Sequence, residues 1–446
     1  MSERRRIVIL GAGGRDFHTF NCLYRDDPSV EVVAFTAAQI PNIDQRRYPP
    51  VLAGPLYPEG IEIVPEDELE GVLAMRGATL CVFAYSDVRF AHVQRMAERV
   101  RAAGAELHPF PVPETMLRSA KPVVAVCAVR TGCGKSPVSR HIAALLREQG
   151  LRVAVLRHPM PYGDLAEQVV QRFASVEDLA RHRCTIEEME EYEPHVRAGN
   201  VVFAGADYER ILRAAEQEAD VILWDGGNND TPFVRPDLLV TLVDPLRPGD
   251  ELTYFPGRWN LENADVVLVP KVSDATESDL AAVRANVAEH APGAVVVEGD
   301  LALDIDRPEA VRGRRALVVE DGPTITHGGM AFGAGLLAAE RAGAAEIVDP
   351  RPGAVGQIAA AFAAYPHVTR VLPALGYGKA EIGDLQATIR RADCDVVVVG
   401  TPVDLRRVLD VEQPTVRVTY RFVERGDRLG EILRERLSAA ASRATA

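Results

Sequence analysis

Residues 130–136 bring two glycines, a lysine and two hydroxyls together in one short turn. Glycines let backbone N–H groups converge on phosphate oxygens, a lysine can reach the β- and γ-phosphates, and a serine hydroxyl can bind Mg²⁺. We therefore predict an ATP and Mg²⁺ site in which Lys135 and Arg130 are catalytic and Ser136 is also a metal ligand. The predicted phosphate contacts are Thr131, Gly132, Cys133, Gly134, Lys135 and Ser136.

The loop differs from the standard phosphate-binding pattern, because Val129 stands where a glycine is expected. It fits better the deviant form K-G-G-x-G-K-[ST], with Arg130 in place of the first lysine. That form is found in dimeric nucleotide-driven ATPases and related enzymes, where the first cation often serves the neighbouring subunit. We therefore expect a homodimer, with Arg130 acting within one chain or between two.

The elements around this loop predict the fold that positions it. An apolar run at 123–129 reads as a buried parallel strand, and a helix with Ile142, Leu145 and Leu146 on one face follows the loop. Further strands are predicted at 152–156, 221–224, 238–243, 266–269 and 294–297. Because these strands alternate with helices, residues 121–300 are predicted to form a doubly wound parallel sheet that binds ligands at the carboxyl ends of its strands.

Several polar residues follow those strand ends. Asp225 ends an apolar strand, as a carboxylate that holds Mg²⁺ does, so we predict a metal-binding and catalytic role for it. Arg157, His158 and Asp164 follow the second strand, and we expect the first two to bind substrate and Asp164 to bind the metal. Lys271 stands where GTPases carry N-K-x-D, and its stem can stack on a purine; the flanking residues do not match guanine recognition, so ATP is favoured.

Residues 1–120 are predicted to form a Rossmann-like domain with strands at 7–10, 31–36, 61–63 and 79–84 and a helix at 88–103. The first glycine loop lacks the third glycine of a dinucleotide fingerprint, and no acidic residue ends the second strand, which argues against NAD. Arg15 and His18 lie on one side of the following helix's first turn. That arrangement suits a substrate phosphate or carboxylate, with a salt-bridged helix cap as the alternative.

Residues 301–446 are predicted to form a C-terminal α/β region, either a separate domain or a continuation of the second. Its strands are expected at 316–319, 346–348, 370–373, 396–399 and 415–419. Residues 320–330 crowd an aspartate, two threonines, a histidine and glycines after a strand, which favours an anion site. The predicted substrate contacts there are Asp321, Thr326 and His327. In the second domain, the acidic segment at 173–200 is predicted to be a solvated helix face or a lid.

Composition limits the function classes. The chain has 446 residues, 47% of them hydrophobic, and a net charge of −14, which argues against nucleic acid as the main partner. Its six cysteines are scattered singly, and no stretch is apolar for long enough to cross a membrane. We expect a reduced, cytoplasmic protein that acts on a small molecule.

Seven motifs together resemble the cyclic 2,3-diphosphoglycerate synthetase family over nearly the whole chain. They are GRDFHTFN at 14–21, VVAFTAAQIPNI at 32–43, YPPVLAGPLYPEGI at 48–61, AVRTGCGKS at 128–136, LRHPMPYGDL at 156–165, WDGGNND at 224–230 and EDGPTITHGGM at 320–330. The resemblance implies a Mg²⁺-dependent enzyme that uses ATP to close a phosphoanhydride between the two phosphates of 2,3-diphosphoglycerate, releasing ADP and phosphate. It implies that Arg15, His18, Arg157, His158 and His327 hold that substrate.

Three other functions fit the same residues. A kinase or ligase of this architecture would act on another phosphorylated metabolite with the same site. A regulatory or metal-trafficking GTPase would share the deviant loop. A nucleotide-sensing module would hold NAD in its N-terminal unit.

Overall fold

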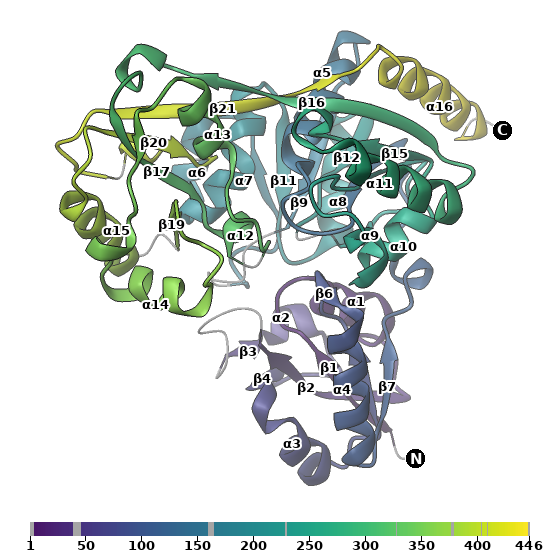
Figure 1. Cartoon of the computed structure of the whole chain (residues 1–446). Helices are drawn as coiled ribbons and strands as arrows, with labels where there is room; N and C mark the ends of the chain where they lie inside the picture. The colour runs from purple at the N-terminus through teal and green to yellow at the C-terminus, as the bar shows by residue number, and fades with distance from the viewer. Residues whose placement is uncertain are drawn as a thin grey trace.

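The computed structural model describes residues 4–38, 46–158, 165–227, 230–326, 328–375, 379–402, 404–407 and 409–444. The chain has a mixed α/β fold with two large sheets built mainly of parallel strands, which confirms that part of the predicted fold class. The strands up to Pro109 form a smaller N-terminal unit, and the rest of the chain forms a larger body above it in Figure 1. No helix among the described residues is long and apolar enough to cross a membrane.

The N-terminal unit is a six-stranded sheet in the order β3-β4-β2-β1-β5-β7. In β1, Ile7 and Ile9 pack on one face of the sheet while Val8 and Leu10 pack on the other, as the two-residue strand period requires. The strands are β1 (Arg5–Leu10), β2 (Val30–Ala37), β3 (Arg47–Tyr48), β4 (Ile61–Pro65), β5 (Leu80–Phe83) and β7 (Glu106–Pro109). The helices are α1 (Arg15–Leu23), α2 (Pro50–Ala53), α3 (Leu69–Arg76) and α4 (Phe90–Ala102).

The larger body contains one sheet in the order β10-β11-β9-β12-β8-β13-β15-β16-β21-β20-β17-β18, with β19 also paired to β17. Its first strands are β8 (Val123–Ala128), β9 (Val153–Arg157), β10 (Gln171–Phe173), β11 (Val201–Ala204), β12 (Val221–Trp224), β13 (Leu238–Leu242) and β15 (Val266–Val269). The others are β16 (Val295–Ile305), β17 (Arg315–Asp321), β18 (Glu346–Ile347), β19 (Leu372–Ala374), β20 (Val396–Gly400) and β21 (Thr415–Glu424). The strands of the second and third predicted regions therefore share one hydrogen-bonded sheet.

Helices cover this sheet between its strands. Those of the first half are α5 (Lys135–Glu148), α6 (Val176–Arg181), α7 (Ile186–Arg197), α8 (Tyr208–Glu218), α9 (Asp250–Thr253), α10 (Gly257–Glu262) and α11 (Glu277–His290). Those of the second half are α12 (Gly322–Ile325), α13 (Ala334–Arg341), α14 (Gly356–Ala364), α15 (Lys379–Arg391) and α16 (Leu429–Ala444).

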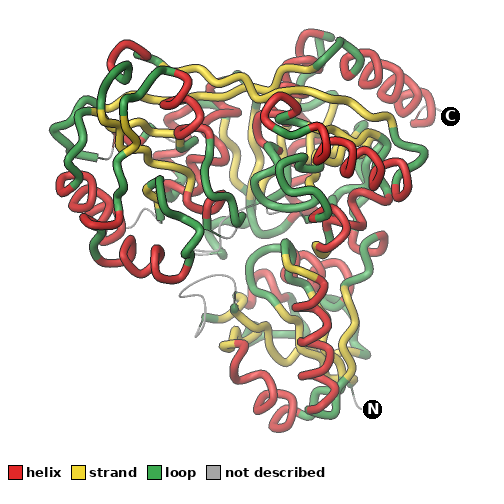
Figure 2. Tube along the Cα trace, viewed as in Figure 1, coloured by secondary structure: helices red, strands yellow, loops and turns green. Residues whose placement is uncertain are grey.

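Two long strands join the halves of the sheet. β16 pairs with β15 in parallel at its start and then runs antiparallel to β21, from Gly299 opposite Glu424 to Ile305 opposite Val418. Figure 2 shows this pair as a yellow ribbon that crosses the whole larger body. The chain then ends in α16, which contacts α5, the helix that follows the glycine loop.

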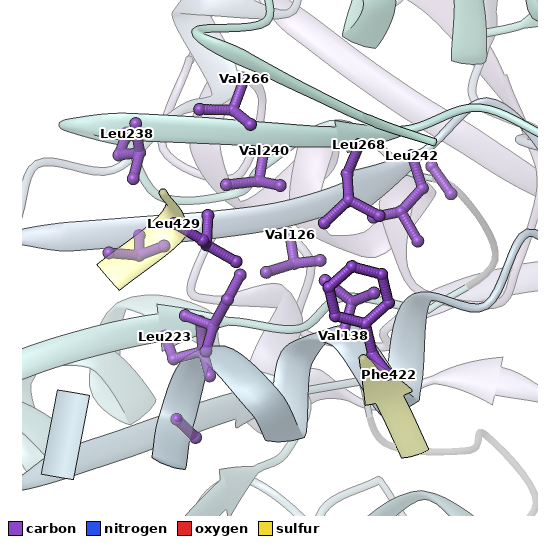
Figure 3. Close-up of a cluster of buried hydrophobic side chains, with 14 of the residues drawn as sticks. Val126, Val138, Leu223, Leu238, Val240, Leu242, Val266, Leu268, Phe422 and Leu429 are labelled. Atoms are coloured by element: carbon purple, nitrogen blue, oxygen red, sulfur yellow. The ribbon is translucent and has the colours of Figure 1, made fainter. Parts of the chain in front are cut away.

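The C-terminal segment also completes the hydrophobic core beneath the glycine loop. Phe422 from β21 and Leu429 from α16 lie among Val126, Val138 and Leu268, which come from the parallel strands and α5 (Figure 3). Both C-terminal side chains are at most 2% exposed. The core of the nucleotide-binding half therefore depends on residues nearly 300 positions after the loop.

Replacing Phe422 with alanine is expected to destabilise the protein by about 3–5 kcal/mol, because a buried phenyl ring is lost and a cavity remains. The measurement is the free energy of unfolding, followed by the fluorescence of the buried Trp224. Phe90→Ala is the matched control, since Phe90 is 39% exposed and its replacement should cost far less. Equal losses for the two variants would contradict the packing of β21 into this core.

The N-terminal unit attaches to the body through a small two-stranded sheet. β6 (Val88–Arg89) pairs antiparallel with β14 (Tyr254–Phe255), directly after α9. The predicted helix at 88–103 therefore starts two residues late, at Phe90, because the first two residues pair with β14 instead. This pairing brings the loop before β6 to the edge of the larger sheet.

Candidate functional site

The glycine loop lies between β8 and α5, as the sequence predicts. All six residues of β8 are buried, so the strand fixes the start of the loop, and α5 begins at Lys135. Gly132 and Gly134 have φ values of +87° and +100°, which other residues rarely adopt. No side-chain hydrogen bond caps the first turn of α5, which leaves its backbone N–H groups available to a ligand. This geometry suits phosphate oxygens.

Asp225, directly after β12, is the most buried charge of the site. Its side chain is 0% exposed, and Lys135 Nζ lies 2.5 Å from Oδ1. Arg157, at the end of β9, approaches Oδ2 to 2.7 Å, and His195 Nε2 lies 3.0 Å from the same oxygen. Burial alone would raise the pKa of Asp225, but the charges of Arg157 and Lys135 and the hydrogen bond from His195 hold it well below its usual range.

The side chains of Lys135, Arg157 and His195 therefore all contact the carboxylate of Asp225, which lies at the carboxyl ends of neighbouring strands. Burial lowers the pKa of Lys135, and the negative charge of Asp225 opposes that effect. Burial likewise lowers the pKa of His195. Lys135 can leave Asp225 and bind a phosphate, because Arg157 and His195 would still contact the Asp225 carboxylate.

Helix α7 supplies His195 to this cluster and a carboxylate that pairs with Arg157. Glu191 pairs with Arg157, and His195 lies four residues later on the same face of α7. Glu188 is 1% exposed and forms a capping box with Thr185. The prediction that this acidic segment is a solvated face is therefore wrong for these residues, because their charges cap the helix or pair with cations of the site.

Arg130 is held within its own chain. Its guanidinium pairs with Asp250, donates a 2.6 Å hydrogen bond to the carbonyl oxygen of Gly328, and lies 4.4 Å from the ring centre of Tyr254. Arg247 also donates to Gly328 O and, at 2.8 Å, to Thr131 O. These two arginines tie the C-terminal half to the glycine loop.

Lys271 supports the loop from the other side. Its ammonium donates to Gly132 O at 2.6 Å and to Asp244 at 3.0 Å. Lys271 has a φ of +59°, a strained conformation for a residue with a side chain. The structure thus gives Lys271 a role in shaping the loop, and contact with a purine stays a prediction.

The N-terminal unit also reaches the glycine loop. The carboxylate of Asp87 accepts from the backbone N–H of Thr131, with both oxygens at 3.3 Å. Asp87 has a φ of +58°, and of the three non-glycine residues with positive φ in the described chain, it and Lys271 both contact this loop. Such strain is often concentrated at functional sites.

Arg15 and His18 lie in a buried contact between the two units. Arg15 Nε is 2.8 Å from Asp230, and the guanidinium lies 3.9 Å from the ring centre of Phe233. The His18 ring stacks on the ring of Phe233, with the ring centres 4.1 Å apart, and its Nε2 forms a 2.7 Å hydrogen bond with the carbonyl oxygen of Thr115. Burial raises the pKa of Asp230 to about 6, although Arg15 opposes it. In this structure the pair anchors the N-terminal unit, and substrate contact stays a prediction.

His158 and the C-terminal loop complete the predicted substrate residues. His158 packs against Gly14 and Gly227, and burial lowers its pKa well below the usual range. Asp321 caps α12 by accepting from Thr324, and Thr326 donates to Gly322 O at 2.7 Å. These bonds order the loop whose Gly328 contacts Arg130. His327 and Asp164 lie outside the described residues.

The residues present fit a magnesium nucleotide. The Ser136 hydroxyl makes no hydrogen bond to a described residue, and the buried Asp225 carboxylate lies one strand away. Within the described ranges no group of three or more histidine, cysteine or acidic side chains could enclose a metal. Mg²⁺ usually takes one or two protein ligands and completes its shell with phosphate oxygens and water, so Ser136 and Asp225 would be enough to hold it.

Sequence reasoning missed Asp87 and His195 of this site. It expected residues 244–250 to form another loop at the strand ends and placed Glu191 in the acidic segment, but it assigned no role to Glu191, Asp244, Arg247 or Asp250. The four-residue spacing of Glu191 and His195 was a usable signal, because it places both side chains on one face of a helix. No comparable pattern pointed to Asp87, which reaches the loop from a different sheet.

Comparison with known proteins gives one strong match. No protein-family model matches the sequence. The chain is 55% identical over 434 residues to a curated protein named arginine synthetase ArcE, from Thermococcus kodakarensis, with 97% of each chain covered. It also resembles the solved structure of LpxK from Aquifex aeolicus, with 13% identity, a TM-score of 0.43 and coverage of 83% of this chain and 99% of that one. The hydrogenase maturation factor HypB from Archaeoglobus fulgidus is 16% identical, with a TM-score of 0.27 and coverage of 47% and 90%.

Proposed function

The chain belongs to the family of the arginine synthetase ArcE, and we propose that it is an ATP-dependent synthetase that forms arginine. The observation that carries the proposal is 55% identity over 97% of both chains. The glycine loop and the Lys135–Asp225 pair supply a site in which such a synthetase would use ATP.

Arginine formation requires a carbon–nitrogen bond at the carbon that becomes the guanidinium carbon. L-Citrulline has the same skeleton with an oxygen at that position, and this ureido oxygen is a poor leaving group. Transfer of the γ-phosphoryl group of ATP to the oxygen would release ADP and convert the oxygen into part of a phosphate ester. Attack by a neutral nitrogen nucleophile would then break the carbon–oxygen bond, release inorganic phosphate and, after loss of a proton, give the guanidinium group.

The chain's own residues would act on the transferring group. Lys135 would move from Asp225 to the β- and γ-phosphates, and Arg157 and His195 would keep Asp225 ionised meanwhile. Arg130, which Asp250 already holds beside the loop, would add positive charge where the phosphoryl group leaves. Mg²⁺ held by Ser136 and Asp225 would neutralise phosphate charge when bound.

The motif resemblance to cyclic 2,3-diphosphoglycerate synthetase fits the same first step. In that reaction the phosphoryl acceptor would be a substrate phosphate, and a second phosphate would be the nucleophile that displaces inorganic phosphate. Both reactions activate an oxygen with ATP and differ in the nucleophile. The match to ArcE over nearly the whole chain favours a nitrogen nucleophile, and phosphoanhydride formation is the competing outcome.

The test is incubation of the purified full-length protein with Mg²⁺, ATP, L-citrulline and ¹⁵N-ammonium, followed by mass spectrometry. We expect arginine carrying one ¹⁵N atom, with ADP and phosphate formed in equal amounts. A parallel reaction contains 2,3-diphosphoglycerate and is followed by ³¹P NMR.

Two comparisons make the result decisive. GTP in place of ATP tests nucleotide choice, and L-aspartate in place of ammonium tests the nitrogen source. A cyclic diphosphate signal without arginine would replace the proposal with the phosphoanhydride reaction. Nucleotide hydrolysis that none of these substrates changes would overturn both.

A further inference from the structure

A cavity of about 220 Å³ lies between the nucleotide-binding half and the C-terminal half. α5 and α7 line it on one side, and β21 and the segment after β20 line it on the other. The volume is below the roughly 300–1,000 Å³ of sites for drug-sized ligands, so it suits a small metabolite better than a nucleotide.

Arg140 enters this cavity from α5 without an anionic partner. Its one hydrogen bond to a described residue is a long one, 3.5 Å to the carbonyl oxygen of Tyr420, and it makes no ion pair within the described chain. Burial lowers the pKa of Arg140. Arg140 is half-buried, and because a cation withdrawn from water is costly unless it is paired, its surroundings favour an anionic ligand.

Arg417 presents a second guanidinium to the same cavity, from β21. Its Nε is buried without a hydrogen-bond partner, while another nitrogen donates to Pro402 O at 2.8 Å. Two arginines that face one cavity can bind a carboxylate with several parallel hydrogen bonds. Glu193 and Asp404 also line the cavity and are both in ion pairs: Glu193 with Arg197 at 2.6 Å, and Asp404 with Arg406 at 2.7 Å and with Arg417 at 3.9 Å.

The cavity is next to the reacting centre. Arg140 lies four residues after Ser136 on the same face of α5, and its charge interacts with Asp225. A ligand bound by the arginines could therefore extend its other end towards Lys135 and Asp225.

We propose that this cavity binds the α-carboxylate and α-ammonium groups of the amino-acid substrate, an assignment that rests on the proposed arginine-forming function. Arg140 and Arg417 hold the carboxylate, and Glu193 and Asp404 face the ammonium group. The side chain of the amino acid then points to the glycine loop. The enzyme selects an α-amino acid over an amine of the same length.

The test compares binding of L-arginine and agmatine, which differs from arginine only by the missing carboxylate. Titration calorimetry of the full-length protein with Mg²⁺ and a non-hydrolysable ATP analogue should show clearly weaker binding of agmatine. Arg140→Gln should weaken L-arginine binding by about 10- to 100-fold, because a charge-assisted hydrogen bond is lost. It should change agmatine binding by less than about twofold, because no coupled partner is present.

Arg147→Gln is the matched control, since Arg147 is an exposed residue on the same helix and does not line the cavity. Asp404→Asn is the second variant and should weaken both ligands, since both carry an amino group. It keeps the test valid if Arg140→Gln fails to fold. Nucleotide binding should stay unchanged in all three variants.

The outcomes separate this inference from the proposed function. Arginine formation by the wild type with an L-citrulline KM that neither cavity variant changes would overturn the inference alone. Arg140-dependent binding of L-arginine by a protein that forms no arginine would overturn the function and keep the amino-acid site. A protein that neither forms arginine nor binds L-arginine would overturn both the proposed function and this inference. Arg140-dependent binding of inorganic phosphate would then assign the cavity to a phosphorylated ligand.

Discussion

Lys135→Ala is expected to lower ATP turnover by about 10²–10³-fold or more, the range found when a single charge-stabilising donor is removed from an active site. The ammonium lies at the first position of α5, 12% exposed and 2.5 Å from Asp225, at the edge of the loop where phosphates would bind. Alanine keeps the helix and removes the one lysine of that loop. The measurement is steady-state release of ADP in the presence of the substrates.

The fold should survive this change. Asp225 keeps Arg157 and His195 as partners, so the buried carboxylate is not left without compensation. Lys121→Ala is the control, because Lys121 precedes β8 and lies away from the loop. Circular dichroism and the thermal midpoint should match the wild type for both variants. Turnover near the wild-type rate with Lys135→Ala would remove the glycine loop from the mechanism.

The strand, loop and helix of the site could be predicted because their causes are local. The apolar run that forms β8 and the glycines with positive φ carry their structure in their own residue types. Asp225 could be placed for the same reason. It ends an apolar strand, and the alternation of strands and helices puts this strand in the same parallel sheet as β8, where it lies beside β8. The helix was located within its true bounds by Ile142 and Leu146, both of which are fully buried.

Contacts between distant segments could not be predicted in this way. Arg15 and His18 have the spacing of an anion site. In the structure, however, residues more than 200 positions later pack against them: Asp230 pairs with Arg15, and Phe233 stacks on the ring of His18. Asp87 reaches the glycine loop only because β6 pairs with β14. A pattern on one helix or loop does not show what packs on it.

The long strand β16 shows a third kind of limit. A strand was predicted at 294–297, where the residues are apolar, whereas the structure extends it to Ile305. Its second half alternates polar and apolar residues, because it pairs antiparallel with β21 and only one face is covered. The alternation was present in the sequence, but its partner strand begins more than 100 residues later.

Asp225→Asn is expected to lower activity by at least about 10²-fold and to raise the Mg²⁺ concentration needed for half-maximal activity. Asparagine keeps the shape of the side chain and removes the charge that three basic groups share. Losing that charge should also destabilise the protein by about 3–5 kcal/mol, because Lys135 would be left without its anion and Arg157 would keep only Glu191. The measurements are Mg²⁺ titration of turnover and the free energy of unfolding.

The double variant separates two roles that Asp225 could have. If Asp225 acts mainly by holding Lys135, the Lys135→Ala and Asp225→Asn effects overlap, and the pair loses little more activity than either single variant. If Asp225 also binds the metal, Asp225→Asn should raise the Mg²⁺ requirement even in the Lys135→Ala background. Stability should show the same less-than-additive coupling, since removing Lys135 relieves one unpaired cation beside asparagine and the double variant should be more stable than Asp225→Asn alone. An unaltered Mg²⁺ requirement in both backgrounds would place the metal ligand elsewhere and leave Asp225 as the residue that positions Lys135 and Arg157.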